Sequence, residues 1–140
     1  MDAAILVSII SASASIAVAG LTFFLTKRKE READWKKQKL EHYREFLEAL
    51  NGVVIRKKNL PPENHLRWAK ACNTVGLVAS QTVLAALWQF QEATSKSNTN
   101  TSPSEHDRCL NQLILAIRAD LGIRPKDDPE AFKFRLWSSD

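Results

Sequence analysis

The chain has few of the residues that build metal sites, disulfide scaffolds and tight turns. Its 140 residues include two cysteines, three histidines, four glycines and five prolines. The cysteines, Cys72 and Cys109, form no CxxC pair, and no Cys or His group has the spacing of metal ligands. We therefore expect no metal and no cofactor, and we expect both cysteines to be small core residues.

Motifs for catalysis are also missing. The three histidines, His42, His65 and His106, fall on different predicted elements, each among polar or charged residues. There is no nucleophile elbow, no HExxH and no GxxxxGK[ST] phosphate loop. No arginine is followed, after four to six intervening residues, by a histidine, which is the spacing found in small helical-bundle ribonucleases. These absences disfavour a nuclease or a nucleotide-binding enzyme, and we predict no catalytic residue.

Charge is absent from the 23 residues between Ala3 and Leu25. A helix of that length spans roughly 35 Å, enough to cross a bilayer. A signal peptide has a shorter apolar region after a positive segment, and here only Met1 and Asp2 come first. The run ASASIAVA resembles a cleavage site and keeps that alternative open. A core helix normally has a charged face, so we favour a membrane anchor over residues 1–26.

Positive charge follows the apolar segment at once. Four basic residues, which we call the basic collar, lie just after it: Lys27, Arg28, Lys29 and Arg31. Lys and Arg at the end of a span mark its cytoplasmic side. The sequence therefore predicts a single-pass membrane protein, with its N-terminus outside and residues 27–140 in the cytoplasm. The collar is expected to contact anionic lipid head groups. Nucleic-acid binding is the other reading of the positive charge, but no aromatic-basic motif accompanies it.

Small and hydroxyl side chains repeat along the apolar segment at steps of 3, 4, 4, 3 and 4 residues. This hydroxyl stripe consists of Ser8, Ser11, Ser15, Ala19, Thr22 and Thr26. The mean step is that of an α-helix, so the six residues share one face. They could pack against a second span, line a water-filled lumen, or bond their own helix carbonyls. All three alternatives stay open.

The remaining pattern is helical, and no alternating strand pattern of any length is present. We expect the first helix to continue to about Ile55, a second to cover about 63–94, and a third to begin at a capping box formed by Ser102, Pro103 and Glu105. Residues 95–104 are predicted to be a mobile loop, Gly122 to end the last helix, and 123–140 to form a tail. The predicted fold is all-α: one transmembrane helix leading into a bundle of three or four helices.

Two groups in the cytoplasmic part are candidates for contacts between helices or copies. The first is an a/d seam, predicted to mediate oligomerisation: Leu40, Tyr43, Leu47, Leu50 and Val54. The second is the pair Arg118 and Asp120, which lies among apolar residues in LAIRADLG. These two charges are either solvated or part of a partly buried charge network.

The segments HYREFLEAL, NTVGLVASQTVLAAL and LILAIRADLG, placed after a single N-terminal span, resemble small bacterial single-pass proteins with a cytoplasmic helical bundle. The chain is similar to the accessory membrane protein encoded beside an RNA-guided, RNA-cleaving CRISPR nuclease. The resemblance implies a homo-oligomeric, ring-shaped membrane pore that strengthens antiviral defence. It implies no catalytic residue.

Together with the sequence pattern, this resemblance implies a homo-oligomeric effector of the bacterial inner membrane that acts in an antiviral or stress response. Its expected partners are further copies of itself, the bilayer, and a cytoplasmic protein or nucleic-acid complex that acts as trigger. The alternative is a membrane anchor that recruits a soluble partner through the basic turn Arg56–Lys58 or the aromatic tail Phe132–Trp137.

Overall fold

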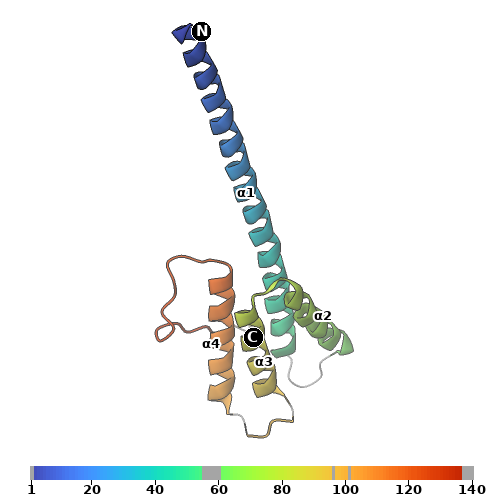
Figure 1. Cartoon of the computed structure of the whole chain (residues 1–140). Helices are drawn as coiled ribbons and strands as arrows, with labels where there is room; N and C mark the ends of the chain where they lie inside the picture. The colour runs from blue at the N-terminus through green and yellow to red at the C-terminus, as the bar shows by residue number, and fades with distance from the viewer. Residues whose placement is uncertain (1, 55–60, 96, 101, 137–140) are drawn as a thin grey trace. The chain divides into compact units, whose positions relative to one another are not determined.

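The computed structural model describes residues 2–54, 61–95, 97–100 and 102–136, and within these ranges the chain contains helices and no strand. The helices are α1 (Ala3–Val54), α2 (Pro62–Val78), α3 (Gln81–Thr94) and α4 (Pro103–Asp120) (Figure 1). The all-α prediction is therefore confirmed. Two compact units divide the chain, Met1–Lys37 and Gln38–Asp140. We call the second unit the helical domain.

Helix α1 is 52 residues long and contains no proline. It runs without interruption through the charged stretch after Thr26, as the sequence predicts, and is described as far as Val54. Its expected end at Ile55 and the basic turn 56–58 lie outside the described residues. Residues of α1 therefore belong to both units.

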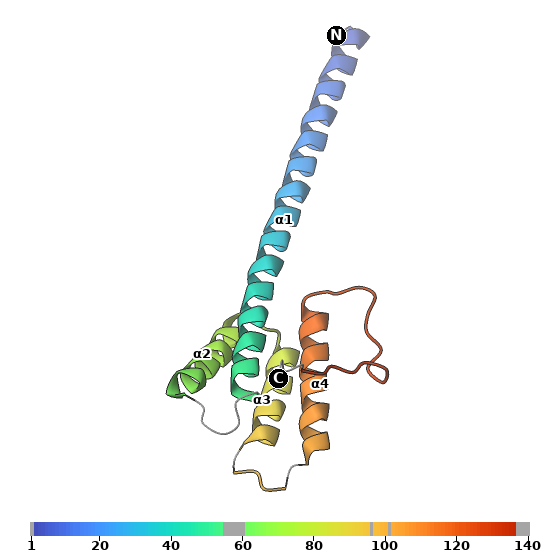
Figure 2. The ribbon, with the colours of Figure 1, turned by 180° about the vertical axis from the view of Figure 1, so that it is seen from behind.

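The core of the helical domain is built from all four helices. Its most deeply buried large side chains are those of Tyr43, Phe46, Leu50, Val75, Val83 and Leu113. Helices α3 and α4 lie side by side (Figures 1 and 2). The Phe46 and Trp68 rings, whose centroids are 5.1 Å apart, join α1 to α2. Each fully buried large apolar side chain contributes about 1.5–3 kcal/mol, so these contacts hold the helices together.

The long helix predicted for 63–94 is wrong, because the chain breaks at Ala79 and Ser80 into α2 and α3. Both residues are extended, with ψ of 150° and 159°. The Ser80 hydroxyl accepts a hydrogen bond from the Val83 N–H at 3.5 Å, and so caps α3. Gly76 lies within α2, and no neighbouring atom lies within 4 Å of a Cβ built there.

Both predicted ends of α4 are confirmed. At the start, the Ser102 hydroxyl accepts a hydrogen bond from the Glu105 N–H at 3.3 Å. At the end, Gly122 has a φ of 70°, which favours glycine, and the Ile123 N–H bonds the Arg118 carbonyl at 3.1 Å. The sequence signals for capping therefore define this helix correctly.

The tail after α4 folds back on the helical domain. The Phe134 N–H donates to the Asn111 side-chain oxygen at 2.7 Å, and the side chains of Phe132, Phe134 and Leu136 pack against the core. Within the tail, the Phe132 N–H donates to the Asp128 carbonyl at 2.9 Å and closes a single turn. Trp137 lies outside the described residues. The aromatic side chains offered above as a docking tail are thus used, as far as position 136, within their own chain.

Candidate functional site

The apolar segment at the start of α1 is not covered by any other part of the described chain. Ile16 is 73% exposed and Phe23 is 65% exposed, and no residue in the most hydropathic window is buried. Among the described residues, α1 is the one helix long and apolar enough to cross a membrane. Length and composition alone also fit a core helix or a signal sequence. Because the apolar segment is exposed, its side chains need lipid or protein to cover them.

The hydroxyl stripe within this segment is exposed along its whole length. The Ser8 hydroxyl donates to the Ala4 carbonyl at 2.9 Å, and the Ser15 hydroxyl donates to the Ser11 carbonyl at 2.8 Å. These two serines satisfy their donors on their own helix, so they need no lumen water. The side chains of the stripe are small enough to let a second helix approach closely.

The four residues of the basic collar differ in their partners. Lys27 pairs with Glu30 at 2.7 Å, and Arg28 pairs with Glu32 at 3.2 Å. Lys29 and Arg31 have no ion-pair partner in the part of the chain that the structure describes. All four side chains are exposed, and Lys29 and Arg31 present positive charge without an ion-pair partner beside the apolar segment.

The predicted oligomer seam is split by the structure. Tyr43 and Leu50 are 1% and 2% exposed within their own chain, and Leu47 packs against the same core. Tyr43 and Leu50 are therefore covered within their own chain and are not available to contact a second copy. Leu40 remains 51% exposed and Val54 remains 40% exposed. Leu40, partly buried Leu47 and Val54, spaced by seven residues, form what we call the outer line.

Asp120 joins three parts of the helical domain through a polar cluster. Its carboxylate pairs with the Lys39 ammonium at 2.9 Å and accepts a hydrogen bond from the Tyr43 hydroxyl. The Ser80 side chain, at the break between α2 and α3, also helps to lower the pKa of this carboxylate. The side chains of Lys39 and Asp120 are 12% and 9% exposed. Asp120 is therefore part of a partly buried charge network and is not solvated, which were the two alternatives that the sequence left open.

Burial tends to raise the pKa of Asp120, but hydrogen bonds from Tyr43, Lys39 and Ser80 and the charge of Lys39 outweigh it. The pKa is held below its ordinary 3.8. Burial and the bond to Asp120 raise the pKa of Tyr43 above its usual range. Asp120 is therefore a carboxylate at neutral pH and Tyr43 is a protonated donor.

Arg118 takes part in a second, more exposed contact. Its guanidinium binds both carboxylate oxygens of Asp127 in the tail, at 2.6 and 2.9 Å, and lies 5.5 Å from the Phe132 ring centroid. The hydrogen bond lowers the pKa of Asp127. Arg118 and Asp120, two residues apart, therefore hold different segments, and they do not form one network.

Sequence reasoning missed Lys39 and Ser80 as members of the Asp120 cluster. Lys39 and Tyr43 are four residues apart, which places both on one face of α1, but nothing in the sequence identified their partner. The cluster joins the middle of α1 to the end of α4, and no group of side chains that could hold a metal ion lies among the described residues. Burial raises the pKa of both Cys72 and Cys109, which disfavours thiolate chemistry.

Comparisons of the chain with protein family models, curated proteins and solved structures found no match.

Proposed function

We propose that this chain is a single-pass membrane protein whose helical domain works on the cytoplasmic side. The observation that carries the proposal is the fully exposed, uncharged start of α1, followed by the basic collar. A bilayer would cover the apolar side chains, and the collar would meet its anionic surface. The helical domain has its own core, and no group of side chains that could hold a metal ion lies among the described residues.

Alkaline carbonate extraction tests the anchor. The full-length chain is expected to stay in the membrane pellet, because removing some 20 apolar residues from lipid is prohibitive. A variant lacking residues 3–26 should appear in the supernatant with helical circular dichroism, since its core lies entirely in the helical domain. Release of the full-length chain by carbonate would contradict the anchor.

We further propose that the protein acts as a homo-oligomer, in the role of a defence or stress effector that the sequence suggests. Two surfaces support this. The hydroxyl stripe suits close packing of spans, and the outer line has the seven-residue spacing of a coiled-coil position. Ala12, Ala19, Thr26 and Ala33 have the same spacing and the same register in the sequence. In one membrane, anchored copies point the same way, so identical helices would run parallel.

Pore formation would be an added property of such an assembly. Because Ser8 and Ser15 already bond their own helix, packing explains the stripe without a lumen. Ion flux across liposome membranes distinguishes an oligomer with a pore from an oligomer that is packed without a lumen. A pore lined by the stripe predicts flux that the double change Ser11→Leu and Ser15→Leu abolishes, whereas packing alone predicts no flux in either protein.

A further inference from the structure

The outward face of α2 carries the two most exposed large apolar side chains of the described helical domain. Leu66 is 72% exposed and Leu77 is 84% exposed. Lys70 and Asn73, which lie between them in the sequence, are exposed as well. The four residues follow at steps of 4, 3 and 4, so they share one face of the helix, opposite the face on which Val75 is buried. We call these four residues the α2 line.

The α2 line is the same in both directions at its ends and complementary at its centre. A leucine stands first and last, and the steps read 4, 3 and 4 either way. The Lys70 ammonium can only donate hydrogen bonds, whereas the Asn73 side chain can accept one. Neither side chain has a hydrogen bond or ion pair within the part of the chain that the structure describes. Glu45, whose carboxylate feels the charge of Lys70, is bonded by Arg67 at 2.8 Å.

A second copy of α2 that runs antiparallel matches the line at every position. Leu66 of each copy then meets Leu77 of the other, and Lys70 meets Asn73, so two apolar contacts flank two hydrogen bonds. In a parallel pair each residue meets itself, and the two Lys70 ammonium groups repel each other. A bilayer would cover the leucines but would also have to take up the polar side chains between them. The charge pattern therefore favours an antiparallel second copy.

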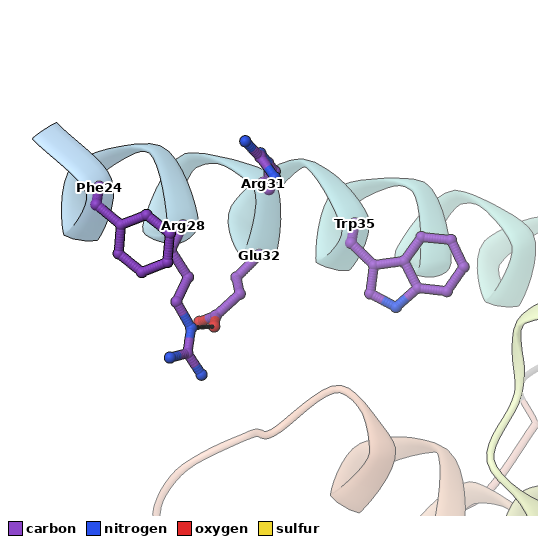
Figure 3. Close-up of a pocket in the computed structure, with 5 residues that line it drawn as sticks. All are labelled: Phe24, Arg28, Arg31, Glu32 and Trp35. Carbon is purple, nitrogen blue, oxygen red and sulfur yellow. Dashed lines mark hydrogen bonds and ion pairs between the residues drawn. The ribbon is translucent and has the colours of Figure 1, made fainter.

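A depression on α1 that also combines apolar and charged side chains lacks such a match. It is lined by Phe24, Arg28, Arg31, Glu32 and Trp35 (Figure 3). Arg31 points to the opposite side of the helix from Arg28 and Glu32, and the Trp35 ring turns away from Phe24. These side chains do not converge on one ligand, whereas the four residues of the α2 line share one face.

We propose that the α2 line is a contact between two copies of this chain, paired antiparallel along α2. The contact rests on the proposed homo-oligomer and adds a second interface to the outer line. Four side chains from each copy bury less than the roughly 1,200 Å² of a stable complex, so this contact alone does not hold two copies together. It forms where the anchor and the outer line already keep copies close to each other.

The test is disulfide cross-linking of the full-length chain, with Cys72→Ala and Cys109→Ala, in isolated membranes with an added oxidant. One copy carries Leu66→Cys, and a second, distinguished by a tag, carries Leu77→Cys. The antiparallel contact places these cysteines opposite each other, whereas two Leu66→Cys copies hold theirs about 16 Å apart along the helix. A disulfide needs Cα atoms within about 7 Å, so we expect about tenfold more mixed than symmetric disulfide.

His65→Cys is the matched control for Leu66→Cys. Position 65 is also exposed, but it lies about 100° around the helix from position 66. Its disulfide with Leu77→Cys should form about tenfold less, because its Cβ does not face the second copy.

An exchange of charges tests the centre of the line. Asn73→Lys is expected to lower the yield of the mixed disulfide about threefold, because two ammonium groups then face each other. Adding Lys70→Glu should restore the yield, since each glutamate then meets a lysine of the other copy.

Equal yields of mixed and symmetric disulfides, or of Leu66→Cys and His65→Cys, would overturn the contact. A Leu66→Cys disulfide that forms only with itself would mean a parallel pair and would overturn the antiparallel arrangement. If no disulfide forms and Leu66→Cys is still protected from a water-soluble maleimide, lipid or another protein covers the line instead. Failure of the homo-oligomer is distinct, because light scattering would then give a monomer for the natural chain.

Discussion

Replacing Asp120 by alanine is expected to destabilise the helical domain by about 3–5 kcal/mol. The change leaves the Lys39 side chain, 12% exposed, without its carboxylate partner and removes the acceptor of the buried Tyr43 hydroxyl. Asp127→Ala is the matched control, since its pair with Arg118 is more exposed, at 21% and 35% for the two side chains. It should cost about 1 kcal/mol or less. Thermal unfolding of the full chain in detergent measures both losses. It is followed by tryptophan fluorescence, which changes when Trp68 loses its packing against Phe46.

A double-mutant cycle separates the Asp120 cluster from general damage. Lys39→Met combined with Asp120→Asn removes both charges, while the amide can still accept the Tyr43 hydrogen bond. We expect the double variant to be more stable than the sum of the two single losses predicts. Strict additivity, or equal losses in Asp120→Ala and Asp127→Ala, would mean that the cluster does not join the helices energetically.

The same cluster predicts a dependence of stability on pH. The pKa of Asp120 is lower in the folded chain than its ordinary 3.8. Its contribution is therefore fully present above about pH 5 and is lost as the pH falls through the folded pKa. The stability difference between the natural chain and Asp120→Asn should shrink between pH 5 and 3. A difference that stays constant over that range would contradict the ionised cluster.

Replacing Leu40 by glutamate is expected to reduce the oligomer in mild detergent to monomers of 15.8 kDa. In a parallel assembly Leu40 of each copy meets the outer line of its neighbour. The change loses about 1.5–3 kcal/mol of burial per side chain and brings like charges together. Because Leu40 is 51% exposed within its own chain, the helical domain itself should unfold at an unchanged temperature.

The control for this change is Gln38→Glu, which adds the same charge two residues away on the opposite face of α1, where Gln38 is exposed. Light scattering with the detergent contribution subtracted gives the protein mass. The account predicts a large natural assembly, the same assembly for Gln38→Glu, and monomers for Leu40→Glu. Equal masses for all three proteins would remove the outer line as an interface.

The outcome for Leu40 and Tyr43 shows how far a helical pattern alone can be taken. The period of 3 and 4 residues correctly predicted helix through the seam, but it could not say which partner covers each side chain. A core in the same chain and a second copy both demand apolar residues. Tyr43 is buried in its own chain because α4 packs beside it and places Asp120 within hydrogen-bonding distance of its hydroxyl.

The break at Ser80 was missed for a related reason. The segment 63–94 carries an uninterrupted apolar stripe, and neither Pro nor Gly marks its middle at 79–80. Serine caps helices but is also tolerated within them, so its role depends on tertiary contacts. At the ends of α4 the signals were stronger, because Ser102 is followed by Pro103 and Glu105, and Gly122 supplies the positive φ.

The most direct test of the central claim is the topology of the anchor. In a chain with Cys72→Ala and Cys109→Ala, single cysteines are introduced as Asp2→Cys and Ser104→Cys, both at exposed positions. Intact spheroplasts are then treated with a membrane-impermeant maleimide. The account predicts that position 2 is labelled at once and that position 104 is labelled only after lysis. Labelling of position 104 in intact spheroplasts would contradict it.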